Sequence, residues 1–464
     1  MRPGYDFQGK RVLVVGLART GEVVSLFAAG YGATVTATDT KSERELGESA
    51  EKLRGAGVTL EVGGHKPEIF ADKDLIVVSP GVPSNLAELK AARAAGIPVW
   101  SEIELAWRFL RGKLVAITGS NGKTTTTSLV AHILKTAGID ALVGGNIGTP
   151  LLALVESSTD SSVTVAEISS FQLEAIEAFR PEIGVLLNLT PDHLDRHASF
   201  EEYAAAKMRL FENQLDRDCA ILNADDPEVT RRMPSKQQVF WFSRQKRVAA
   251  GAYLRDGQII FRRDGEEVPL LKREQIPLRG EHNVENVLGA CAAAYLAGAE
   301  PNAIANGVKS FQGVEHRLEF VAEIDGVEFF NDSKATNVDS AVKAIEAFPG
   351  PLIVILGGKD KGSPYTPLVE PLRQRARTAI LIGAAAEKIA SDFGNAVPYV
   401  HAETIDRAVQ LATSAAQPGD TVLLAPACSS FDQFENYEQR GRTFKDLVRG
   451  IESRSTANAK ARKG

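Results

Sequence analysis

Residues 114–128 read Leu114-Val-Ala-Ile-Thr-Gly-Ser-Asn-Gly-Lys-Thr-Thr-Thr-Thr-Ser128, and this stretch decides how the rest of the chain is interpreted. The apolar run 114–117 predicts a short buried strand, 119–122 a tight turn, and 125–137 a helix that Gly138 ends. A buried strand leading through a glycine turn into a helix is the unit from which parallel α/β sheets are built.

The turn between this strand and helix suits a phosphate group. Gly119 and Gly122 let backbone N–H groups face an anion, the helix N-terminus adds its positive dipole, and Lys123 adds a point charge. Thr124 offers a hydroxyl to Mg²⁺. The usual P-loop pattern has another glycine six residues before the lysine, where Ile117 stands. A glycine-containing turn also occurs in many α/β proteins, but Gly-Lys-Thr in this position favours a nucleoside triphosphate site.

Composition indicates a globular protein of several domains. At ~150 residues per domain, 464 residues suggest two or three domains. A hydrophobic content of 44% with 24% charged residues is ordinary for a soluble protein. The net charge of -6 provides no basic surface for a nucleic acid, so we expect no such partner.

The cysteines and the N-terminus indicate a cytoplasmic location. Cys219, Cys291 and Cys428 have no paired spacing, which argues against a zinc site or a disulfide framework and fits a reducing compartment. The first residues lack the apolar core of a signal peptide, and no run of 18 apolar residues occurs. We therefore expect no membrane insertion.

The N-terminal segment predicts a βαβ unit. A strand at 11–15 leads into Gly16-Leu-Ala-Arg-Thr-Gly21, a helix to about Gly30, and a second strand at 34–38 followed by Asp39. An acid at this distance from a glycine turn can bind a nucleotide ribose. The middle glycine of the dinucleotide pattern is absent, so the two glycines can equally serve close strand–helix packing. Further strands at 75–79 and 97–100 and a helix at 103–110 complete the segment.

Polar residues follow two strands after the phosphate-binding turn. Glu167 follows a strand at 162–166, and Asn188 follows one at 183–187. Ligands bind at the carboxyl ends of parallel strands, so Glu167 is a candidate metal ligand. The alternative is an acid that starts the next helix, where negative charge is favoured.

Two further side chains could serve chemistry or simply structure. His193 lies in the polar loop 192–197, where histidine can ligate a metal or move a proton but is often only solvated. Lys207 shares a helix face with Tyr203, Leu210 and Phe211. A lysine there usually extends its ammonium to solvent, and less often is a buried amine with a lowered pKa.

Downstream, residues 238–271 read as short strands of structural character, and Gly280 precedes a helix that runs to 296. Asn283 and Asn286 share a face of this helix; their amides can hydrogen-bond an adenine edge, and the alternative is that Asn283 caps the helix.

A domain boundary is predicted near Gly313. A hairpin with strands 317–324 and 327–330 delivers the polar loop 331–337. Strands at 352–356, 379–382, 399–400 and 421–425 then alternate with helices, which predicts a second doubly wound sheet with polar loops at 357–361 and 426–431. The segment from about 453 has no apolar periodicity and is expected to be a mobile tail.

These motifs together resemble the Mur ligase family of bacterial peptidoglycan synthesis. The matching residues are Thr118-Gly-Ser-Asn-Gly-Lys-Thr-Thr125, Glu167, Asn188-Leu-Thr-Pro-Asp-His193-Leu-Asp195, Lys207, His282-Asn283-Val-Glu-Asn286, His316-Arg317 and Asn331-Asp-Ser-Lys334-Ala-Thr336-Asn337. Three stretches most resemble the D-glutamate-adding branch: Gly144-Gly-Asn-Ile-Gly148, Ile168-Ser-Ser-Phe-Gln-Leu173 and Ser429-Ser-Phe-Asp-Gln-Phe-Glu-Asn-Tyr-Glu-Gln-Arg-Gly441. The Asp-Asn-Pro-Arg motif of the diaminopimelate- or lysine-adding branch is absent.

The resemblance implies three α/β domains and an activity. Residues 1–103 would form a Rossmann-like domain for the UDP substrate, 104–313 a central ATP-binding P-loop domain with a parallel or mixed sheet, and 314–464 a Rossmann-like, doubly wound domain for the amino acid. The enzyme would be a cytoplasmic monomer that joins D-glutamate to UDP-N-acetylmuramoyl-L-alanine through an acyl phosphate. Its cofactors would be ATP, two Mg²⁺ ions and a lysine carbamate derived from CO₂.

The family pattern also implies site residues. The catalytic residues would be Lys123, His193, Lys207 and Lys334, and the metal ligands Thr124, Glu167, His193 and Lys207 as its carbamate. ATP would contact Gly119, Ser120, Asn121, Gly122, Lys123, Thr124, Thr125, Asn283, Asn286, Arg317 and Asp332. The UDP substrate would contact Arg19, Thr20, Asp39, Ser79, Gly81 and Asn146, and D-glutamate would contact Thr336, Lys361, Ser430, Phe431 and Tyr437.

Other activities stay open on the sequence. Within the class, the chain could be an L-alanine-adding or a folylpolyglutamate-type ligase. Outside it, the N-terminal unit alone could indicate a nicotinamide dehydrogenase and the P-loop alone a nucleotide switch, but neither explains the loop 331–337.

Overall fold

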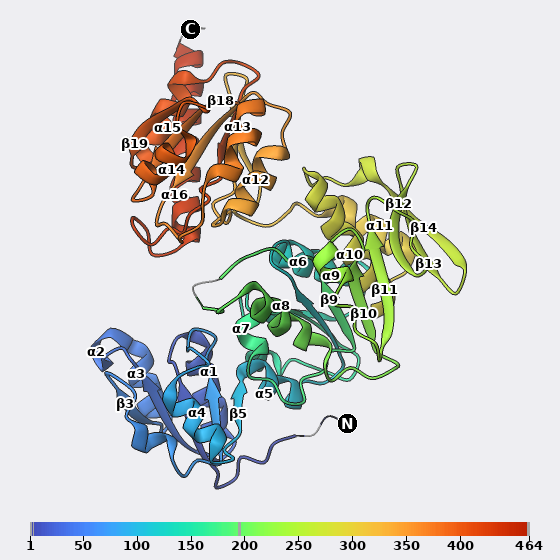
Figure 1. Cartoon of the computed structure of the whole chain (residues 1–464), viewed down its shortest axis with the longest axis vertical. Coiled ribbons are helices and arrows are strands. Elements are labelled where there is room, and N and C mark those ends of the chain that lie inside the picture. Colours follow the sequence, from blue (N-terminus) through green and yellow to red (C-terminus); the bar gives the residue numbers. More distant parts are fainter. Residues whose placement is uncertain (1, 3, 194–195, 462–464) are drawn as a thin grey trace. The chain divides into compact units, whose positions relative to one another are not determined.

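The computed structural model describes Arg2, residues 4–193 and residues 196–461, with side chains up to residue 453. It divides into two compact units: Met1–Gln275 with Glu285–Ser310, and Ile276–Val284 with Phe311–Gly464. Three sheets, each flanked by helices, make up these units (Figure 1). The first two sheets belong to the first unit and the third to the second, so the predicted three-sheet α/β class is confirmed.

The first sheet has five parallel strands with its apolar β1 at the centre. Its helices include α1 (Arg19–Gly30), α2 (Glu43–Leu46), α3 (Glu48–Gly55), α4 (Ala87–Ala94) and the 3₁₀ turn η1 (Pro67–Phe70). Strand order reverses between β1 and β4, so the loops after these two strands flank the crevice where such sheets bind ligands. In spatial order the strands are β3 (Thr59–Val62), β2 (Thr34–Asp39), β1 (Arg11–Val15), β4 (Leu75–Val78) and β5 (Val99–Ser101).

Helix α5 (Glu102–Phe109) connects the first sheet to the second, and buried carboxylates anchor it. Glu104 Oε2 accepts hydrogen bonds from the backbone N–H groups of Glu177, Ala178 and Phe179 at 2.7–2.9 Å. Glu102 Oε1 accepts one from Leu152 N at 2.6 Å. Because each carboxylate satisfies backbone donors of the central sheet's loops, α5 is fixed to them.

The second sheet has nine strands, with β6 (Lys113–Thr118) between β8 and β9. Strands β7 to β12 and β6 run parallel, and β13 and β14 add antiparallel strands at one edge. The segment 238–271 therefore extends the central sheet. In spatial order the strands are β14 (Glu266–Lys272), β13 (Gln258–Arg263), β12 (Gly251–Arg255), β11 (Gln238–Ser243), β10 (Cys219–Asn223), β9 (Ile183–Leu186), β6, β8 (Val163–Glu167) and β7 (Ala141–Gly145).

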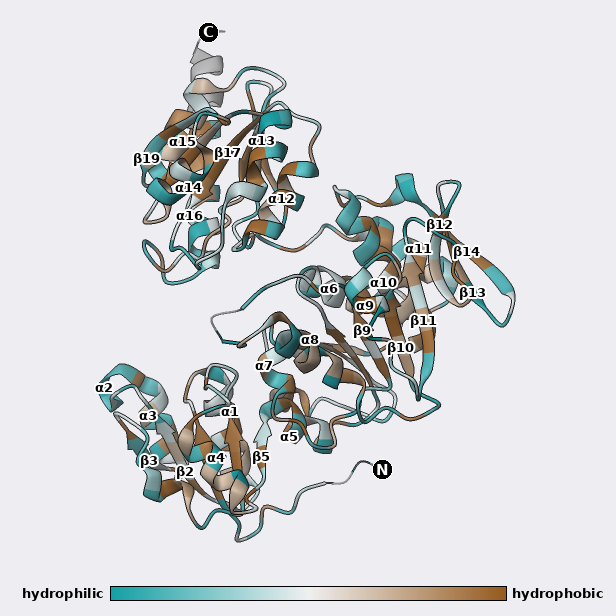
Figure 2. Ribbon diagram, in the orientation of Figure 1, coloured by the Kyte–Doolittle hydropathy of each residue, from teal (hydrophilic) through white to brown (hydrophobic). Residues whose placement is uncertain are grey.

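Short helices and two long ones accompany the central sheet. The strands β8 and β9 in the middle of this sheet are buried along their whole length, as expected where helices cover a parallel sheet, and the strands around β9 and β10 are largely brown in Figure 2. The helical elements are α6 (Lys123–Thr136), η2 (Leu151–Leu154), α7 (Ser170–Leu173), α8 (Phe200–Met208), η3 (Arg209–Phe211), α9 (Pro227–Thr230), η4 (Arg273–Gln275), α10 (Glu281–Ala297) and α11 (Pro301–Ser310).

The third sheet is parallel except for its edge strand β15, which forms the predicted hairpin with β16. Apolar clusters line both of its faces. In spatial order the strands are β15 (Glu319–Ile324), β16 (Val327–Asn331), β20 (Thr421–Leu424), β17 (Leu352–Gly357), β18 (Ala376–Ile382) and β19 (Tyr399–Glu403). The helices are α12 (Val338–Glu346), η5 (Thr366–Leu368), α13 (Val369–Arg375), α14 (Ala386–Phe393), α15 (Ile405–Ala415) and α16 (Tyr437–Ala461).

Helix α16 differs from the prediction for the C-terminal end. It continues to Ala461, through most of the segment expected to be a tail, while residues 462–464 lie outside the described residues. Among the described helices, none is long and apolar enough to cross a membrane. The three cysteines are free thiols.

Candidate active site

The turn after β6 has the geometry of a phosphate-binding loop. Gly119 and Gly122 have φ values of +154° and +84°, and α6 begins directly at Lys123. A Cβ on Gly122 would stand 2.1 Å from Asn286 Oδ1, so a side chain there would collide with α10. Both the backbone conformation and the close approach of Asn286 therefore require glycine.

Lys123 lies over this turn. Its Nζ donates to Gly119 O at 2.9 Å and to Ser120 O at 2.8 Å. Ser120 in turn accepts a hydrogen bond from the Tyr203 hydroxyl at 2.9 Å, and Asn188 Oδ1 accepts one from Asn121 N at 2.8 Å. Side chains from α8 and from the end of β9 thus hold the turn from behind, which leaves the lysine beside a rigid set of backbone N–H groups.

Thr124 and Glu167, the residues predicted to bind a metal, lie side by side. The Thr124 hydroxyl donates to Glu167 Oε2 at 2.8 Å, and Asn146 Nδ2 donates to Glu167 Oε1 at 2.8 Å. Glu167 is 2% exposed and ends β8, whereas α7 is capped by Ser169. The carboxylate is therefore not a helix-start acid. A hydroxyl and a carboxylate side by side at a phosphate-binding turn suit Mg²⁺, which prefers hard oxygen ligands.

Lys207 is buried rather than extended to solvent. It is 2% exposed; its Nζ donates to Gly119 O at 2.9 Å and lies 4.7 Å from the centre of the Tyr203 ring. Burial lowers the pKa of Lys207 well below its usual value, nearby Lys123 lowers it further, and Asp192 and Glu167 oppose the shift only in part. Lys207 thus has the environment of a neutral, reactive amine.

His193 lies in the loop after β9, at a φ of +54°. Its Nε2 lies 3.7 Å from Asp192 Oδ2, and its ring packs edge-on against Phe171 at 5.0 Å. Asp195 lies outside the described residues. Farther along the loop, Arg196 donates to the carbonyls of Gly81 and Val82 at 3.2 Å, so it contacts the loop that follows β4.

The residues predicted for the UDP substrate surround the loops after β1 and β4. Ser79 Oγ donates to Gly16 O at 2.7 Å, which joins the two loops. Asp39 accepts from Leu17 N at 2.5 Å and from Lys41 N at 2.9 Å, so its carboxylate also organises the first loop. A Cβ on Gly21 would stand 1.8 Å from Gly16 O, so close packing alone requires this glycine. Arg19 and Thr20 begin α1 beside it.

The second unit carries its own group of predicted nucleotide contacts. Burial raises the pKa of Asp332 to about 6, although Arg317 lowers it in part. Asp332 Oδ1 and Arg317 Nε are both buried without a hydrogen-bond partner among the described residues. Such groups call for a ligand, since buried polar atoms are normally satisfied. Asn283 lies in this unit and donates to Arg279 O at 2.7 Å, whereas Asn286 lies in the first unit.

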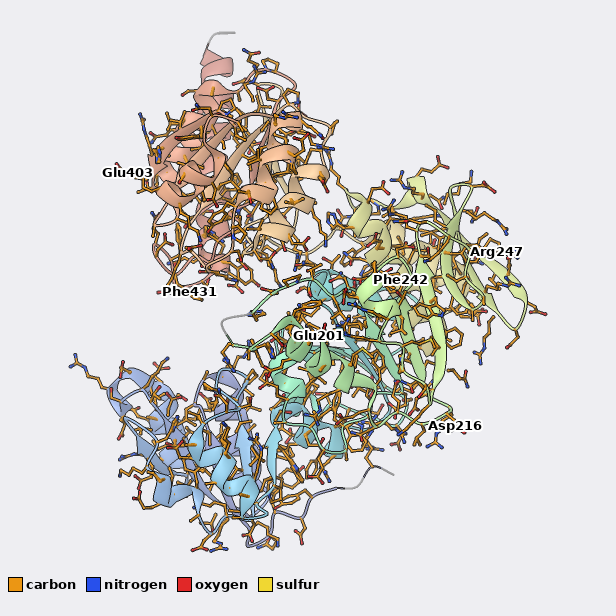
Figure 3. The ribbon with its side chains drawn as sticks, viewed as in Figure 1. Glu201, Asp216, Phe242, Arg247, Glu403 and Phe431 are labelled. Carbon is orange, nitrogen blue, oxygen red and sulfur yellow. The ribbon has the colours of Figure 1, made fainter. Side chains whose placement is uncertain are left out.

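Three loops bring together the residues predicted for the amino acid. They leave the carboxyl ends of β16, β17 and β20, of which β20 is the middle strand. Lys361 Nζ donates to Thr336 Oγ1 at 3.4 Å. Ser430 is 2% exposed, while the neighbouring Phe431 is 66% exposed and points outward (Figure 3). Tyr437 starts α16, and the Lys334 ammonium lies 5.3 Å from its ring centre.

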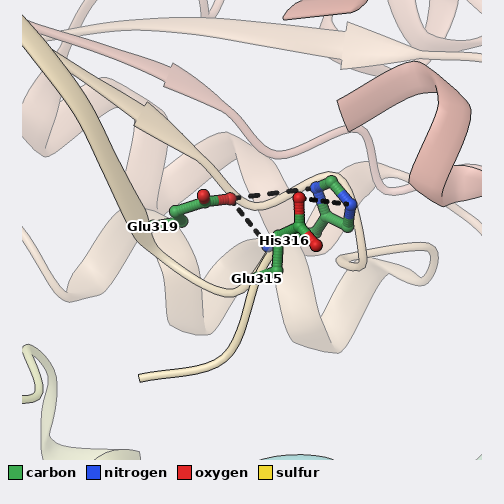
Figure 4. Close-up of side chains that lie close together, drawn as sticks. All are labelled: Glu315, His316 and Glu319. Atoms are coloured by element: carbon green, nitrogen blue, oxygen red, sulfur yellow. Dashed lines mark hydrogen bonds and ion pairs between the residues drawn. The ribbon is translucent and has the colours of Figure 1, made fainter. Parts of the chain in front are cut away.

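Sequence reasoning missed several buried polar residues here. Arg440 and Tyr365 are each 1% exposed, and both contact the loop that follows β20. Glu315, His316 and Glu319 form the cluster in Figure 4, whose spacing would admit a metal. Lys445 Nζ already bonds both carboxylates, at 2.5 Å to Glu315 and 2.9 Å to Glu319, so a side-chain cation balances their charge. Arg440 and His316 lie in stretches that carry the family resemblance, but no role was predicted for either. The contacts of Arg440 and Tyr365 join residues far apart in sequence, so no local pattern predicts them.

Fold and site together define the class of protein. It is an α/β enzyme whose central sheet carries a predicted phosphate-binding turn, and whose other two sheets have polar loops at the carboxyl ends of their strands. Three family models match the chain: Mur ligase MurD-like, N-terminal domain at 10–101, Mur ligase middle domain at 117–294, and Mur ligase, glutamate ligase domain at 316–428. The chain belongs to the Mur ligase family, as the resemblance predicted.

Curated relatives match nearly the whole length. A UDP-N-acetylmuramoylalanine–D-glutamate ligase of Acidobacterium capsulatum is 55% identical over 96% of this chain and 97% of its own. One of Koribacter versatilis is 53% identical over 96% of this chain and 98% of its own.

Solved structures share the fold. A pseudomurein peptide ligase type C from Methanothermus fervidus has a TM-score of 0.60 at 20% identity, covering 96% of this chain and 100% of its own. A UDP-N-acetylmuramate-alanine ligase from Thermotoga maritima has a TM-score of 0.59 at 19% identity, covering 95% and 100%.

Proposed function

We propose that this chain is an ATP-dependent ligase that joins D-glutamate to UDP-N-acetylmuramoyl-L-alanine in peptidoglycan precursor synthesis, releasing ADP and phosphate. The observation that carries the proposal is the 55% identity over 96% of the chain to a D-glutamate-adding ligase. The buried Thr124–Glu167 pair beside the phosphate-binding turn supports it, because this pair supplies the ligands that ATP-bound Mg²⁺ needs.

The chemistry follows from the difficulty of joining a carboxylate to an amine in water. The carboxylate of the L-alanyl end takes the γ-phosphoryl group of ATP, and the amine of D-glutamate then displaces phosphate from the acyl phosphate. Lys123 and the backbone N–H groups of residues 119–124 would hold the β- and γ-phosphates, while Thr124 and Glu167 would hold one Mg²⁺. Bound there, Mg²⁺ would supply positive charge beside the phosphate oxygens, and such charge is the main source of catalysis in phosphoryl transfer.

Lys207 would serve a second Mg²⁺ after conversion to a carbamate. The ammonium first loses a proton, and the neutral amine then adds to CO₂ and releases a second proton, so that a cation becomes an anion with two oxygens. The burial that lowers the pKa of Lys207 favours the neutral amine that this step needs. His193 would be a further ligand of this second ion, and Asn146, bonded to Glu167, would lie near the acyl group.

The remaining substrate contacts divide between the two units. Asn286, of the first unit, and Asn283, Arg317 and Asp332, of the second, would contact the nucleotide, and Lys334 would approach the γ-phosphate. The unsatisfied buried atoms of Arg317 and Asp332 support this role.

The two ends of the chain would set specificity. Arg19, Thr20 and Asp39 would contact the uridine end of the substrate, with Ser79 and Gly81 near its diphosphate. D-Glutamate has two carboxylates and needs two sets of donors, which Thr336, Lys361, Ser430, Phe431 and Tyr437 would supply with hydroxyls, backbone N–H groups and an ammonium. We further propose three functional domains at 1–103, 104–313 and 314–464. We also propose that the protein is a monomer, and that it acts in the cytoplasm, where the ATP for the reaction is available.

Phosphate release with ATP tests the function. The protein with UDP-N-acetylmuramoyl-L-alanine should release phosphate with D-glutamate and not with L-glutamate or L-alanine. Release with UDP-N-acetylmuramate and L-alanine, or with a folate and L-glutamate, would instead assign one of the two related ligase activities and refute the proposal.

The acceptor site has a separate test. Ser430→Ala and Lys361→Ala should each raise the KM for D-glutamate about tenfold or more, because each removes a donor to a charged oxygen, while the KM for ATP stays within twofold. Ser414→Ala, an exposed serine on α15, is the control and should change neither constant. Equal changes in both constants would place these residues elsewhere.

A further inference from the structure

Two loops that carry proposed acceptor residues are joined by a buried tyrosine. The loop 358–363 leaves β17 and contains Lys361; the loop 425–431 leaves β20 and contains Ser430. Lys359 N donates to Ser429 O at 2.9 Å, and Ser429 Oγ donates to Lys359 O at 3.1 Å. Backbone pairing therefore fixes the bases of these loops, but it does not reach Lys361.

The tip of the first loop is shaped by Asp360. Its Oδ1 accepts from Gly362 N at 3.1 Å, which closes a tight turn around Lys361, and Gly362 has a φ of +85°. Its Oδ2 accepts from Lys388 Nζ at 2.8 Å. Since Lys361 stands between the two ends of the Asp360–Gly362 hydrogen bond, the orientation of the Asp360 carboxylate sets the direction of the lysine.

Tyr365 holds this carboxylate. Its ring is buried, its hydroxyl lies 2.8 Å from Asp360 Oδ1 and 3.0 Å from Cys428 Sγ, and its backbone N–H is fixed by Asp392 Oδ2 at 2.7 Å. A carboxylate can only accept, so the single hydroxyl proton goes to Asp360 and the thiol donates to the hydroxyl oxygen. Burial raises the pKa of Cys428 to about 11, which keeps that proton on sulfur. Hydrogen bonds from the Cys428 thiol to the Tyr365 hydroxyl and on to the Asp360 carboxylate thus connect the two loops.

The geometry points to Tyr365 as a positioning residue for the amino-acid substrate: its hydroxyl orients Asp360, and through the turn at Gly362 it aims Lys361 at a carboxylate of the acceptor. The inference rests on the proposed acceptor site. Tyr365 itself contacts no substrate, so its effect reaches the acceptor only through Lys361.

Removal of one oxygen tests this role. Tyr365→Phe keeps the buried ring and loses the bond to Asp360; it should raise the KM for D-glutamate about tenfold, with kcat and the KM for ATP within twofold, since a hydrogen bond to a charged group is lost. Tyr399→Phe, which removes a hydroxyl from the exposed edge strand β19, is the matched control and should leave all three constants unchanged.

A double-mutant cycle separates positioning from general support. In a Lys361→Ala background, Tyr365→Phe should add less than a twofold change in the KM for D-glutamate, because the lysine on which it acts is gone. A further tenfold increase in the KM for D-glutamate in the Lys361→Ala background would refute the positioning role. So would an equal loss of kcat and of ATP binding in Tyr365→Phe alone. If Lys361→Ala alone leaves the KM unchanged, the acceptor site and this inference both fail. If Lys361→Ala raises it and Tyr365→Phe does not, the inference alone fails.

Discussion

Arg440 offers a quantitative test of what holds the acceptor loops together. Its guanidinium is buried, and three of its nitrogens donate to the loops after β16 and β20. Nε donates to Ser333 Oγ at 3.0 Å and Nη2 to Ser333 O at 2.8 Å. Nη1 and Nη2 donate to Cys428 O at 3.3 and 3.2 Å, and Nη1 also to Ser429 O at 3.4 Å. One planar fork thus joins two loops that lie almost a hundred residues apart.

Arg440→Lys is the informative change because it keeps a buried positive charge. A single ammonium at the Nη2 position would still reach Ser333 O and Cys428 O, but it would lose the bonds to Ser333 Oγ and Ser429 O. We take about 1.5 kcal/mol for each of the two charge-assisted bonds, the lower end of the usual range, because Ser429 O keeps its bond from Lys359 N. The expected loss of unfolding free energy is then about 3 kcal/mol. For a unit of this size, that corresponds to a fall in Tm of roughly 6–12 °C.

Calorimetry and far-UV circular dichroism should detect this loss in the second unit. The three tryptophans, Trp100, Trp107 and Trp241, all belong to the first unit, so their fluorescence should report an unfolding midpoint that does not change. Arg442→Lys, exposed on the same helix, is the control and should stay within about 0.5 kcal/mol. If Arg440→Lys is as stable as Arg442→Lys, the buried fork contributes nothing and the reasoning is wrong.

Three further outcomes are expected. Lys123→Ala should abolish ATP-dependent phosphate release while circular dichroism stays unchanged, because the lysine acts on phosphate charge; near-normal turnover would remove the phosphate-binding assignment. Lys207→Arg should lose most activity but still bind ATP, and ¹³C-bicarbonate should give a carbamate signal in the parent protein alone; a fully active variant would exclude the carbamate. Burial raises the pKa of Glu102 to about 7 from an ordinary 4.5. Between these two pH values the folded state binds more protons than the unfolded state, so the free energy of unfolding should fall by roughly 3 kcal/mol as the pH rises from below 4.5 through 7. In urea titrations at pH 5 and pH 8, Glu102→Gln should lack this fall, and the exposed control Glu156→Gln should keep it; identical pH dependence in Glu102→Gln and the parent protein would contradict this origin.

Much of the fold could be read from periodicity. Buried runs such as residues 352–356, bounded by turn residues, predicted parallel strands, and the strand, turn and helix around Gly-Lys-Thr were also predicted. The strands β3 and β10 and the helices α2 and α3 were missed because they are short, although Ser42 and Glu45 form a capping box that starts α2. The strand pattern at 238–271 was recognised, but not that it extends the central sheet, since sheet membership depends on pairing between distant strands.

The predicted site likewise has a part that local sequence indicates and a part that only the folded structure shows. Local sequence is sufficient to predict a turn whose glycines and lysine lie within a few residues of one another, and the positive φ values of Gly119 and Gly122 fit that prediction. The sequence left Lys207 open between an ammonium that extends to solvent and a buried amine with a lowered pKa, and only the packing of α8 against Gly119 decided for burial.

Long-range polar contacts needed the tertiary structure altogether. Arg440 binds Ser333, and Tyr365 binds Cys428, across 107 and 63 residues of chain. No local pattern predicts either contact, because the hydrogen bonding of a buried group depends on which strands are neighbours in the sheet. The sequence therefore predicts the phosphate-binding turn and the three sheets, whose signals are local and periodic, while desolvation and the partners of buried side chains are properties of the folded chain alone.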